Sequence, residues 1–170
     1  MLRRPLRSFR RHLLDRMVLR PSQHPIHAPT LKRVILPCET ETIECFVQQS
    51  HSDSEPPDLL ILKFPGTAGR AERSTSFPTP MLDVERTAIW TWNPPGYGGS
   101  NGKASLATMA RAGSAFWQSV TEKHAGPNTS IWLCGNSLGC ATVLHIAAKH
   151  TPDPAHTGLV LRNPPPLKLV

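Results

Sequence analysis

The sequence feature that most constrains the fold is the stretch of residues 130–149, which reads SIWLCGNSLGCATVLHIAAK. Its start at residues 131–134 is typical of a buried strand, and its second half has apolar residues at helical spacing up to a stop at 151–152. Between them lies a Gly-x-Ser-x-Gly pattern centred on Ser137. A serine in this context is typical of a nucleophile elbow, a strained turn that holds the hydroxyl clear of the backbone. The alternative is a Gly-rich turn in which Ser137 only caps the helix.

The positive charge of the chain is concentrated near its N-terminus. The net charge is +7, yet residues 1–36 carry nine Arg and Lys against one acidic residue, whereas the remainder carries ten basic and eleven acidic residues. A nucleic-acid-binding domain spreads basic residues over its folded surface, so we expect no nucleic-acid partner. The length of 170 residues suits one domain. We place it at 31–170, after a basic helix and a Pro-rich linker at 1–30.

The four cysteines show neither a C-x-x-C pair nor the spacing of metal ligands. We therefore expect no metal and no cofactor, and we expect reduced thiols in a cytoplasmic compartment. The sequence has no run of about 18 apolar residues, so no transmembrane helix is expected. The N-terminus also lacks the apolar core of a secretory signal.

Residues 1–20 carry an apolar stripe with steps of three and four residues. Its members are Leu2, Leu6, Phe9, Leu13 and Met17. Arginines fill much of the remaining surface, so the pattern predicts a basic amphipathic helix, interrupted near its start by a proline. Three interpretations are open: a surface helix that packs its stripe onto the domain, a peripheral membrane contact with anionic headgroups, and a transit peptide or nucleic-acid arm.

The remainder of the chain alternates β-rich and helical patterns. Two β-rich pieces at 34–36 and 42–47 are predicted as antiparallel first strands. Further strands are predicted at 59–64, 87–92, 131–134 and 158–161, with helices at 105–123 and after Ser137, and a weaker helix candidate at 73–84. Buried strands that alternate with helices predict an α/β fold, a three-layer sandwich with a mainly parallel central sheet.

Three loops are expected to meet at the carboxyl edge of this sheet, where ligands of open α/β sheets bind. They are the small-residue loop 66–70, the Gly- and Pro-rich loop 93–102, and the turn at Ser137. The first loop leaves backbone N–H groups free to point at an oxyanion, and an ordinary strand-to-helix turn is an equally good interpretation. The second lacks the G-K-[ST] ending of a phosphate loop, so no nucleotide site is expected.

These motifs resemble those of the α/β-hydrolase superfamily, particularly compact serine hydrolases of the abhydrolase-domain type. The resemblance covers about residues 31–165 and rests on FPGT at 64–67, NPPGYGGS at 93–100, GNSLG at 135–139 and LRNPP at 161–165. It implies Ser137 as the nucleophile and the backbone N–H groups of Leu138 and Thr67 as oxyanion donors. The implied chemistry is hydrolysis of a carboxylic ester or thioester through an acyl-enzyme.

The sequence departs from the family pattern in its loops. Pro65 stands where many relatives carry His before the glycine of the oxyanion loop, and Asn93 stands where many carry Asp. The backbone donor at Thr67 survives the first change. Some relatives take their acid from the end of the strand after the elbow helix. Here that position offers Asn163, whose amide cannot serve as a carboxylate.

The triad partners are also missing from their expected places. The family order is Ser, acid, His, with the last two on later strands. After Ser137 the acidic and histidine side chains are His145, His150, Asp153 and His156. A helix rises ~1.5 Å per residue, so the elbow helix carries the chain roughly 20 Å from the carboxyl edge. The last three are therefore expected at the wrong edge, and His145 projects from the middle of the helix.

We therefore expect the first part of an α/β-hydrolase that ends before the acid and base of its triad, with activity at Ser137 absent or impaired in this chain. The expected partners are a small-molecule or lipid acyl substrate and a peripheral membrane contact through residues 1–20. The alternative is a non-catalytic, membrane-peripheral or protein-binding module that retains the hydrolase fold.

Overall fold

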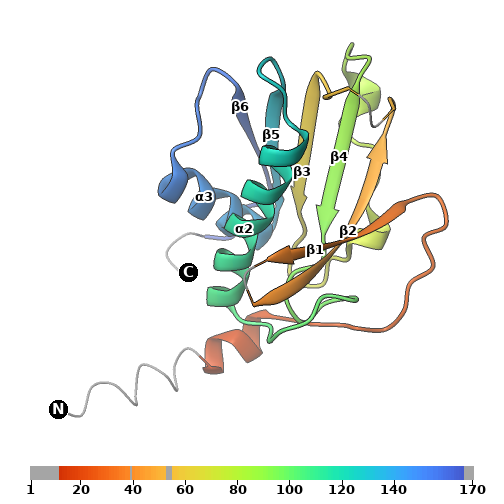
Figure 1. Cartoon of the computed structure of the whole chain (residues 1–170). Helices are drawn as coiled ribbons and strands as arrows, with labels where there is room; N and C mark the ends of the chain where they lie inside the picture. Colours follow the sequence, from red (N-terminus) through yellow and green to blue (C-terminus); the bar gives the residue numbers. More distant parts are fainter. Residues whose placement is uncertain (1–11, 39, 53–54, 167–170) are drawn as a thin grey trace.

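The computed structural model describes residues 12–38, 40–52 and 55–166. Within these residues the strands form one six-stranded sheet in the order β1-β2-β4-β3-β5-β6 (Figure 1). The strands are β1 (Lys32–Cys38), β2 (Glu41–Gln49), β3 (Leu59–Phe64), β4 (Thr87–Trp92), β5 (Ser130–Asn136) and β6 (Thr157–Arg162). The pairs β1–β2 and β2–β4 are antiparallel, whereas β4–β3, β3–β5 and β5–β6 are parallel. The predicted mainly parallel sheet with antiparallel first strands is confirmed.

Two α-helices cover one face of this sheet, α2 (Leu106–His124) and α3 (Gly139–His150) (Figure 1). Helix α2 begins with a capping box, in which the Thr108 N–H donates to Ser105 Oγ at 3.0 Å. This arrangement satisfies one of the amides that a helix leaves unpaired at its start. The predicted helix at 105–123 is therefore confirmed, with Ser105 as its cap.

Three aromatic rings fill the space between the helices and the carboxyl ends of β3 and β4. Trp92 stacks on Phe116 with centroids 5.6 Å apart, and Phe64 meets both rings edge-on at 5.8 and 5.7 Å. All three side chains are at most 1% exposed, and such rings each bury roughly 150–250 Å². Phe64 and Trp92 are the last residues of their strands. The core therefore fixes the points at which the two loops of the carboxyl edge begin.

The opposite face of the sheet is covered by the connection between β3 and β4. This connection contains two 3-10 turns, η1 (Ala71–Arg73) and η2 (Thr79–Met81). The helix predicted at 73–84 is not formed, because Pro78 and Pro80 lack the N–H donor and clash with the preceding turn of a helix. Leu82 and Val84 nevertheless pack on apolar side chains of this face, which are Leu59, Ile61 and Ile89.

The N-terminal segment lies at the carboxyl edge, on the side toward which the arrows of β3 and β4 point (Figure 1). Residues 12–18 are helical. Leu19 is buried against Met109 of α2 and Leu138 beside the elbow, and the Asp15 carboxylate accepts a hydrogen bond from the Leu106 N–H at 2.9 Å. The segment is therefore attached to the first turns of both helices.

The apolar stripe predicted for this helix does not pack onto the domain where it is described. Leu13 and Met17 are 51% and 66% exposed. The interpretation of a helix that buries this stripe is therefore wrong for these two residues. The other stripe residues, Leu2, Leu6 and Phe9, lie outside the described part of the chain.

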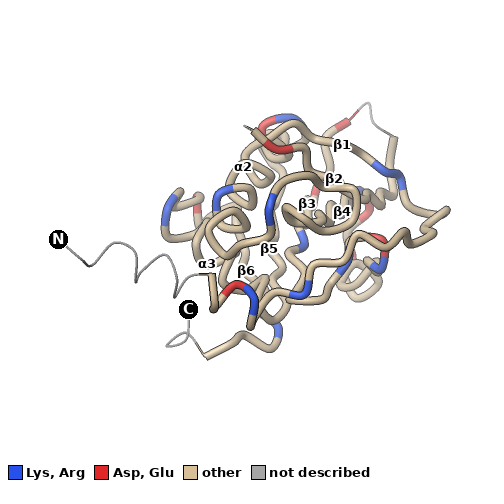
Figure 2. The backbone as a smooth tube through the Cα atoms, turned by 90° about the horizontal axis from the view of Figure 1, so that it is seen from below, with Lys and Arg blue, Asp and Glu red and all other residues tan. Residues whose placement is uncertain are grey.

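In the view from below, Lys and Arg are interspersed with Asp and Glu along the described chain (Figure 2). No helix among the described residues combines the length and the apolar composition needed to cross a membrane.

Candidate active site

The turn at Ser137 joins the end of β5 to the start of α3. Ser137 has φ 51, in the left-handed region, which costs a non-glycine residue about 1–3 kcal/mol and needs support from its surroundings. That support comes from two hydrogen bonds: the Ser137 N–H donates to the Arg162 carbonyl at 2.8 Å, and the Cys140 N–H donates to the Ser137 carbonyl at 2.9 Å. The predicted strand, tight turn and helix are confirmed.

The alternative interpretation, in which Ser137 caps the helix, is wrong. The N-cap position of α3 is occupied by Leu138, and no side chain makes a capping hydrogen bond there. In the described part of the chain, Ser137 Oγ has no hydrogen-bond partner. Ser137 as a residue is half-buried at the bend.

The two glycines of the pattern are required by close backbone approaches. A Cβ atom at Gly135 would lie 2.7 Å from the Cα of Cys140, and one at Gly139 would collide with the carbonyl oxygen of Phe64. Real Cβ atoms are not found within 3.0 Å of such neighbours. The lack of a side chain at each glycine therefore allows neighbouring backbone, at Cys140 and at Phe64, to pack closely against the turn.

The loop after β3 lies directly beside Ser137. The Gly69 N–H donates to the Gly66 carbonyl at 2.9 Å, which closes a tight turn. A Cβ atom at Gly66 would lie 3.0 Å from the Cβ and 3.7 Å from the Oγ of Ser137. Within the described residues, the backbone N–H groups of Thr67 and Leu138 have no hydrogen-bond acceptor. The structure therefore brings together the three residues that the sequence singled out, Ser137, Leu138 and Thr67.

Tyr97 holds this loop, a role that the sequence analysis missed. Its hydroxyl donates to the Thr67 carbonyl at 2.8 Å and accepts the Arg20 N–H at 3.2 Å. Burial of the side chain raises the pKa of the Tyr97 phenol, so it stays protonated and able to donate. It is the only tyrosine in the chain and lies among the glycines of loop 93–102, which is the signal that could have identified it.

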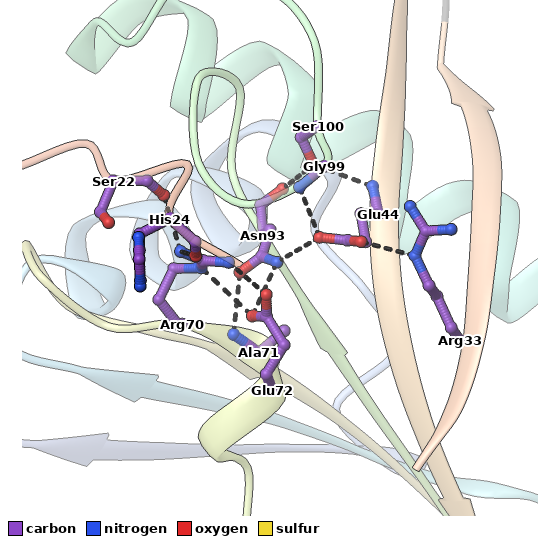
Figure 3. Close-up of polar contacts among 10 residues, drawn as sticks. All are labelled: Ser22, His24, Arg33, Glu44, Arg70, Ala71, Glu72, Asn93, Gly99 and Ser100. Atoms are coloured by element: carbon purple, nitrogen blue, oxygen red, sulfur yellow. Dashed lines mark hydrogen bonds and ion pairs between the residues drawn. The ribbon is translucent and has the colours of Figure 1, made fainter. Parts of the chain in front are cut away.

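A buried polar network lies behind the two loops, centred on Asn93 (Figure 3). Asn93 is fully buried, and its Nδ2 donates to Glu44 Oε2 at 2.7 Å and to Glu72 Oε2 at 2.9 Å. Its Oδ1 accepts the Ala71 N–H at 2.8 Å. An amide is the group that this position needs, because a carboxylate has no hydrogen to donate to two neighbouring carboxylates. The network therefore favours an amide over a carboxylate at position 93.

Glu44 remains charged within this network. Burial alone would raise the pKa of Glu44, but hydrogen bonds from the Gly99 N–H, Arg33 and Asn93 outweigh burial and lower it. The Gly99 N–H and Arg33 Nε are each 2.6 Å from a carboxylate oxygen. The second carboxylate, Glu72, forms an ion pair with buried Arg70. The Glu44 carboxylate of strand β2 is thereby hydrogen-bonded to Asn93 and Gly99 of loop 93–102.

Arg70 extends the network to the N-terminal segment (Figure 3). Its Nη1 donates to the carbonyls of Ser22 and His24 at 2.8 and 3.0 Å, and the Gly98 N–H donates to the Ser22 carbonyl at 2.9 Å. The segment that follows the N-terminal helix is therefore fastened to both loops of the carboxyl edge.

The histidines and the acid after Ser137 do not reach its hydroxyl. The His156 carbonyl accepts the N–H of Ile131 at the start of β5, and Asp153 Oδ1 accepts the Ala155 N–H, so both residues lie at the amino edge as expected. His150 packs on the ring of Trp117. In the part of the chain that the structure describes, no histidine or carboxylate contacts Ser137 Oγ.

A cavity of about 250 Å³ opens beside the elbow and is lined by Gly66 and Asn136. Its walls combine apolar Phe77 with the basic side chains of Lys63 and Arg162. Cys134 also lines it, and burial raises the pKa of Cys134 to about 11, so this cysteine is a thiol at neutral pH and a poor competing nucleophile. The described residues contain no group of three or more His, Cys, Asp or Glu side chains arranged for a metal ion.

A scan against protein-family models and a search of curated proteins found no match. Solved structures do match. An α/β-hydrolase from Vibrio vulnificus has a TM-score of 0.63 at 18% identity, covering 94% of this chain and 58% of that one. An α/β serine hydrolase without a lid from Xanthomonas campestris has a TM-score of 0.52 at 15% identity, covering 76% of this chain and 61% of that one.

A membrane phospholipase A, described as a bacterial virulence factor, has a TM-score of 0.54 at 18% identity and covers 95% of this chain. The chain spans 61%, 44% and 58% of the length of the Xanthomonas, phospholipase and Vibrio proteins. The chain therefore has the α/β-hydrolase fold over a stretch shorter than two thirds of these neighbours.

Proposed function

We propose that this chain is a serine hydrolase domain that acts on a carboxylic ester or thioester through an acyl-enzyme on Ser137. The observation that carries the proposal is the Ser137 hydroxyl at a strained bend, beside the backbone N–H groups of Leu138 and Thr67. None of these three groups has a hydrogen-bond partner among the described residues. Backbone strain at a residue whose hydroxyl has no hydrogen-bond partner among the described residues is typical of a functional site. Neighbours of the same fold include serine hydrolases and a phospholipase, which supports the same chemistry.

The reaction would proceed in two steps. Ser137 Oγ forms a bond to the carbonyl carbon while its proton passes to an imidazole or a similar base from outside the described residues, and the N–H groups of Thr67 and Leu138 stabilise the resulting oxyanion. The C–O or C–S bond then breaks, and the leaving group takes a proton. Water hydrolyses the acyl-enzyme by the same route.

In this proposal Ser137 is the nucleophile and Thr67 and Leu138 are the oxyanion donors, but the described residues bring no base to Ser137 Oγ. Removal of a triad member leaves roughly a 10³–10⁴-fold acceleration over water, from the oxyanion hole and binding. We therefore propose that the activity of this chain on its own is impaired.

A fluorophosphonate probe with peptide mapping tests the proposal. We expect slow modification at Ser137, accelerated by imidazole in solution because imidazole supplies the missing base. If no modification is found at Ser137 with or without imidazole, or if another residue is modified instead, the proposal is wrong.

A second candidate is a non-catalytic module that retains the hydrolase fold. The observation that favours it is the same lack of a base at Ser137 Oγ among the described residues. Absence of probe modification together with binding of vesicles would support this module, whereas modification of Ser137 excludes it.

The substrate class is proposed from the neighbouring cavity, whose lining includes Gly66 and Asn136 but not Ser137 itself. Its apolar and basic walls suit an acyl chain attached to a polar or anionic group, and we propose a small-molecule or lipid acyl ester. We further propose a reducing, cytoplasmic location, which is supported by Cys45, Cys134 and Cys140, because these cysteines form no disulfide among the described residues.

Replacing Gly66 with alanine is expected to slow the modification of Ser137 by tenfold or more. The added Cβ would lie 3.0 Å from Ser137 Cβ and 3.1 Å from the Asn136 carbonyl oxygen, so the loop has to move away from the elbow. A displacement of about 1 Å costs on the order of 10² in rate, and such crowding costs about 1–3 kcal/mol of stability. Probe kinetics and denaturant unfolding measure both effects. An unchanged modification rate would show that the loop does not assist the reaction.

A further inference from the structure

The N-terminal helix at residues 12–18 presents a group of apolar side chains to solvent. We call this group the outer face: Leu13 (51% exposed), Leu14 (43%) and Met17 (66%). At 100° per residue, positions 13, 14 and 17 share one side of a helix. Positions 15, 18 and 19 lie on the other side, which faces the domain. The helix already packs on the domain through its inner face, so the side chains of the outer face remain exposed to solvent.

The inner face fixes the helix next to the nucleophile. Leu19 packs with Leu138, the residue that follows Ser137, and Asp15 accepts the first N–H of α2. The Arg20 N–H donates to Tyr97, which in turn holds the Thr67 carbonyl. The outer face is therefore fixed relative to Ser137 by apolar packing and by hydrogen bonds.

Basic residues flank the outer face. Arg16 and Arg20 are exposed, and Lys103 Nζ lies 3.3 Å from His12 Nε2 at the start of the helix. Asp15 is the only acidic residue among residues 1–36, and its carboxylate is turned toward α2. The sequence continues the apolar spacing back to Leu2 with five further arginines. Exposed apolar residues flanked by arginine are typical of helices that lie in a membrane interface.

We infer that the outer face docks on a membrane surface that contains anionic lipids. A second copy of the chain is a poorer occupant, because three side chains are too few for the roughly 1,200–2,000 Å² of a stable interface. The like charges of two such helices would also repel. If Ser137 acts as proposed above, docking through the outer face brings a lipid ester to the edge of the sheet where Ser137 lies. This consequence rests on the proposed function, whereas the docking itself does not.

Vesicle co-sedimentation of the full chain tests the inference. We expect binding to phosphatidylcholine vesicles that contain phosphatidylserine, weaker binding to phosphatidylcholine alone, and at least a tenfold loss of affinity when Leu13, Leu14 and Met17 are all replaced by serine. Replacing Arg16 with glutamine should weaken binding about fivefold, because one arginine near such a surface contributes about 1 kcal/mol.

A matched control replaces exposed apolar residues elsewhere, Ile35 (44% exposed) and Met81 (78%), with serine. This double variant should bind vesicles as the unmodified chain does. The inference is overturned if the unmodified chain does not sediment with the anionic vesicles, if the triple variant binds equally well, or if the triple variant changes only the oligomeric state. Probe modification of Ser137 without vesicles is measured in parallel, so a failure of docking is distinguished from a failure of the proposed function.

Discussion

Replacing Ser137 with alanine is expected to abolish modification by the fluorophosphonate probe while the protein stays folded. Ser137 Oγ has no hydrogen-bond partner among the described residues, so its removal leaves no buried polar group unpaired. We expect the free energy of unfolding to change by less than about 1 kcal/mol. Intact mass with and without probe measures the first effect, and denaturant unfolding measures the second.

A glycine at the same position separates chemistry from strain. Ser137→Gly also removes the nucleophile, but glycine adopts φ 51 without steric cost. Glycine relieves the backbone strain, but it also gives the unfolded chain more freedom, which offsets part of this effect. We therefore expect the free energy of unfolding to rise by up to about 1 kcal/mol. Ser76→Ala, an exposed serine outside the elbow, should retain normal modification. Modification that persists in Ser137→Ala would remove Ser137 as the nucleophile.

The elbow and the sheet could be predicted from the sequence because their signals are local. Strand β5 and helix α3 have contrasting periodicity on either side of Ser137, and the two glycines mark the turn. The carboxyl-edge position of the three loops follows from the alternation of strands and helices. None of these inferences requires knowledge of which distant side chains meet.

The buried network could not be predicted because its members are far apart in the sequence. Asn93 and Glu44 are 49 positions apart, and each alone is typical of a polar loop or an exposed strand position. One of the three interpretations of the N-terminal helix, in which its stripe packs onto the domain, is wrong for Leu13 and Met17 for a related reason. Periodicity identified the stripe of Leu13 and Met17, but the domain packs against Leu19, which the stripe does not include. Local patterns reveal an apolar face but do not reveal its partner.

Replacing Asn93 with aspartate is expected to destabilise the protein by about 3–5 kcal/mol at pH 8, the cost of an uncompensated buried charge. The new carboxylate would face Glu44 Oε2 and Glu72 Oε2 across the 2.7 and 2.9 Å now bridged by Nδ2. One carboxyl of the cluster must then take up a proton on folding, so its pKa is raised in the folded state.

The uptake of this proton determines how the stability of Asn93→Asp depends on pH. A carboxyl whose pKa is raised by folding costs no stability below its unfolded pKa of about 4, and the cost grows as pH rises toward the folded pKa. The difference in stability between the two proteins should therefore be smaller at pH 5 than at pH 8. The original protein behaves oppositely, because the lowered pKa of Glu44 contributes stability above about pH 4 that is lost on acidification.

Thermal unfolding at both pH values tests this prediction, and the measurement at pH 5 remains informative if Asn93→Asp is unfolded at pH 8. Adding Glu44→Gln to Asn93→Asp should recover part of the stability, because the amide at position 44 can donate to the new carboxylate. Asn128→Asp, at an exposed position, should change stability by no more than about 0.5 kcal/mol. If Asn93→Asp matches the original protein at pH 8, then position 93 has no need of a donor, and the charged network does not hold the two loops beside Ser137.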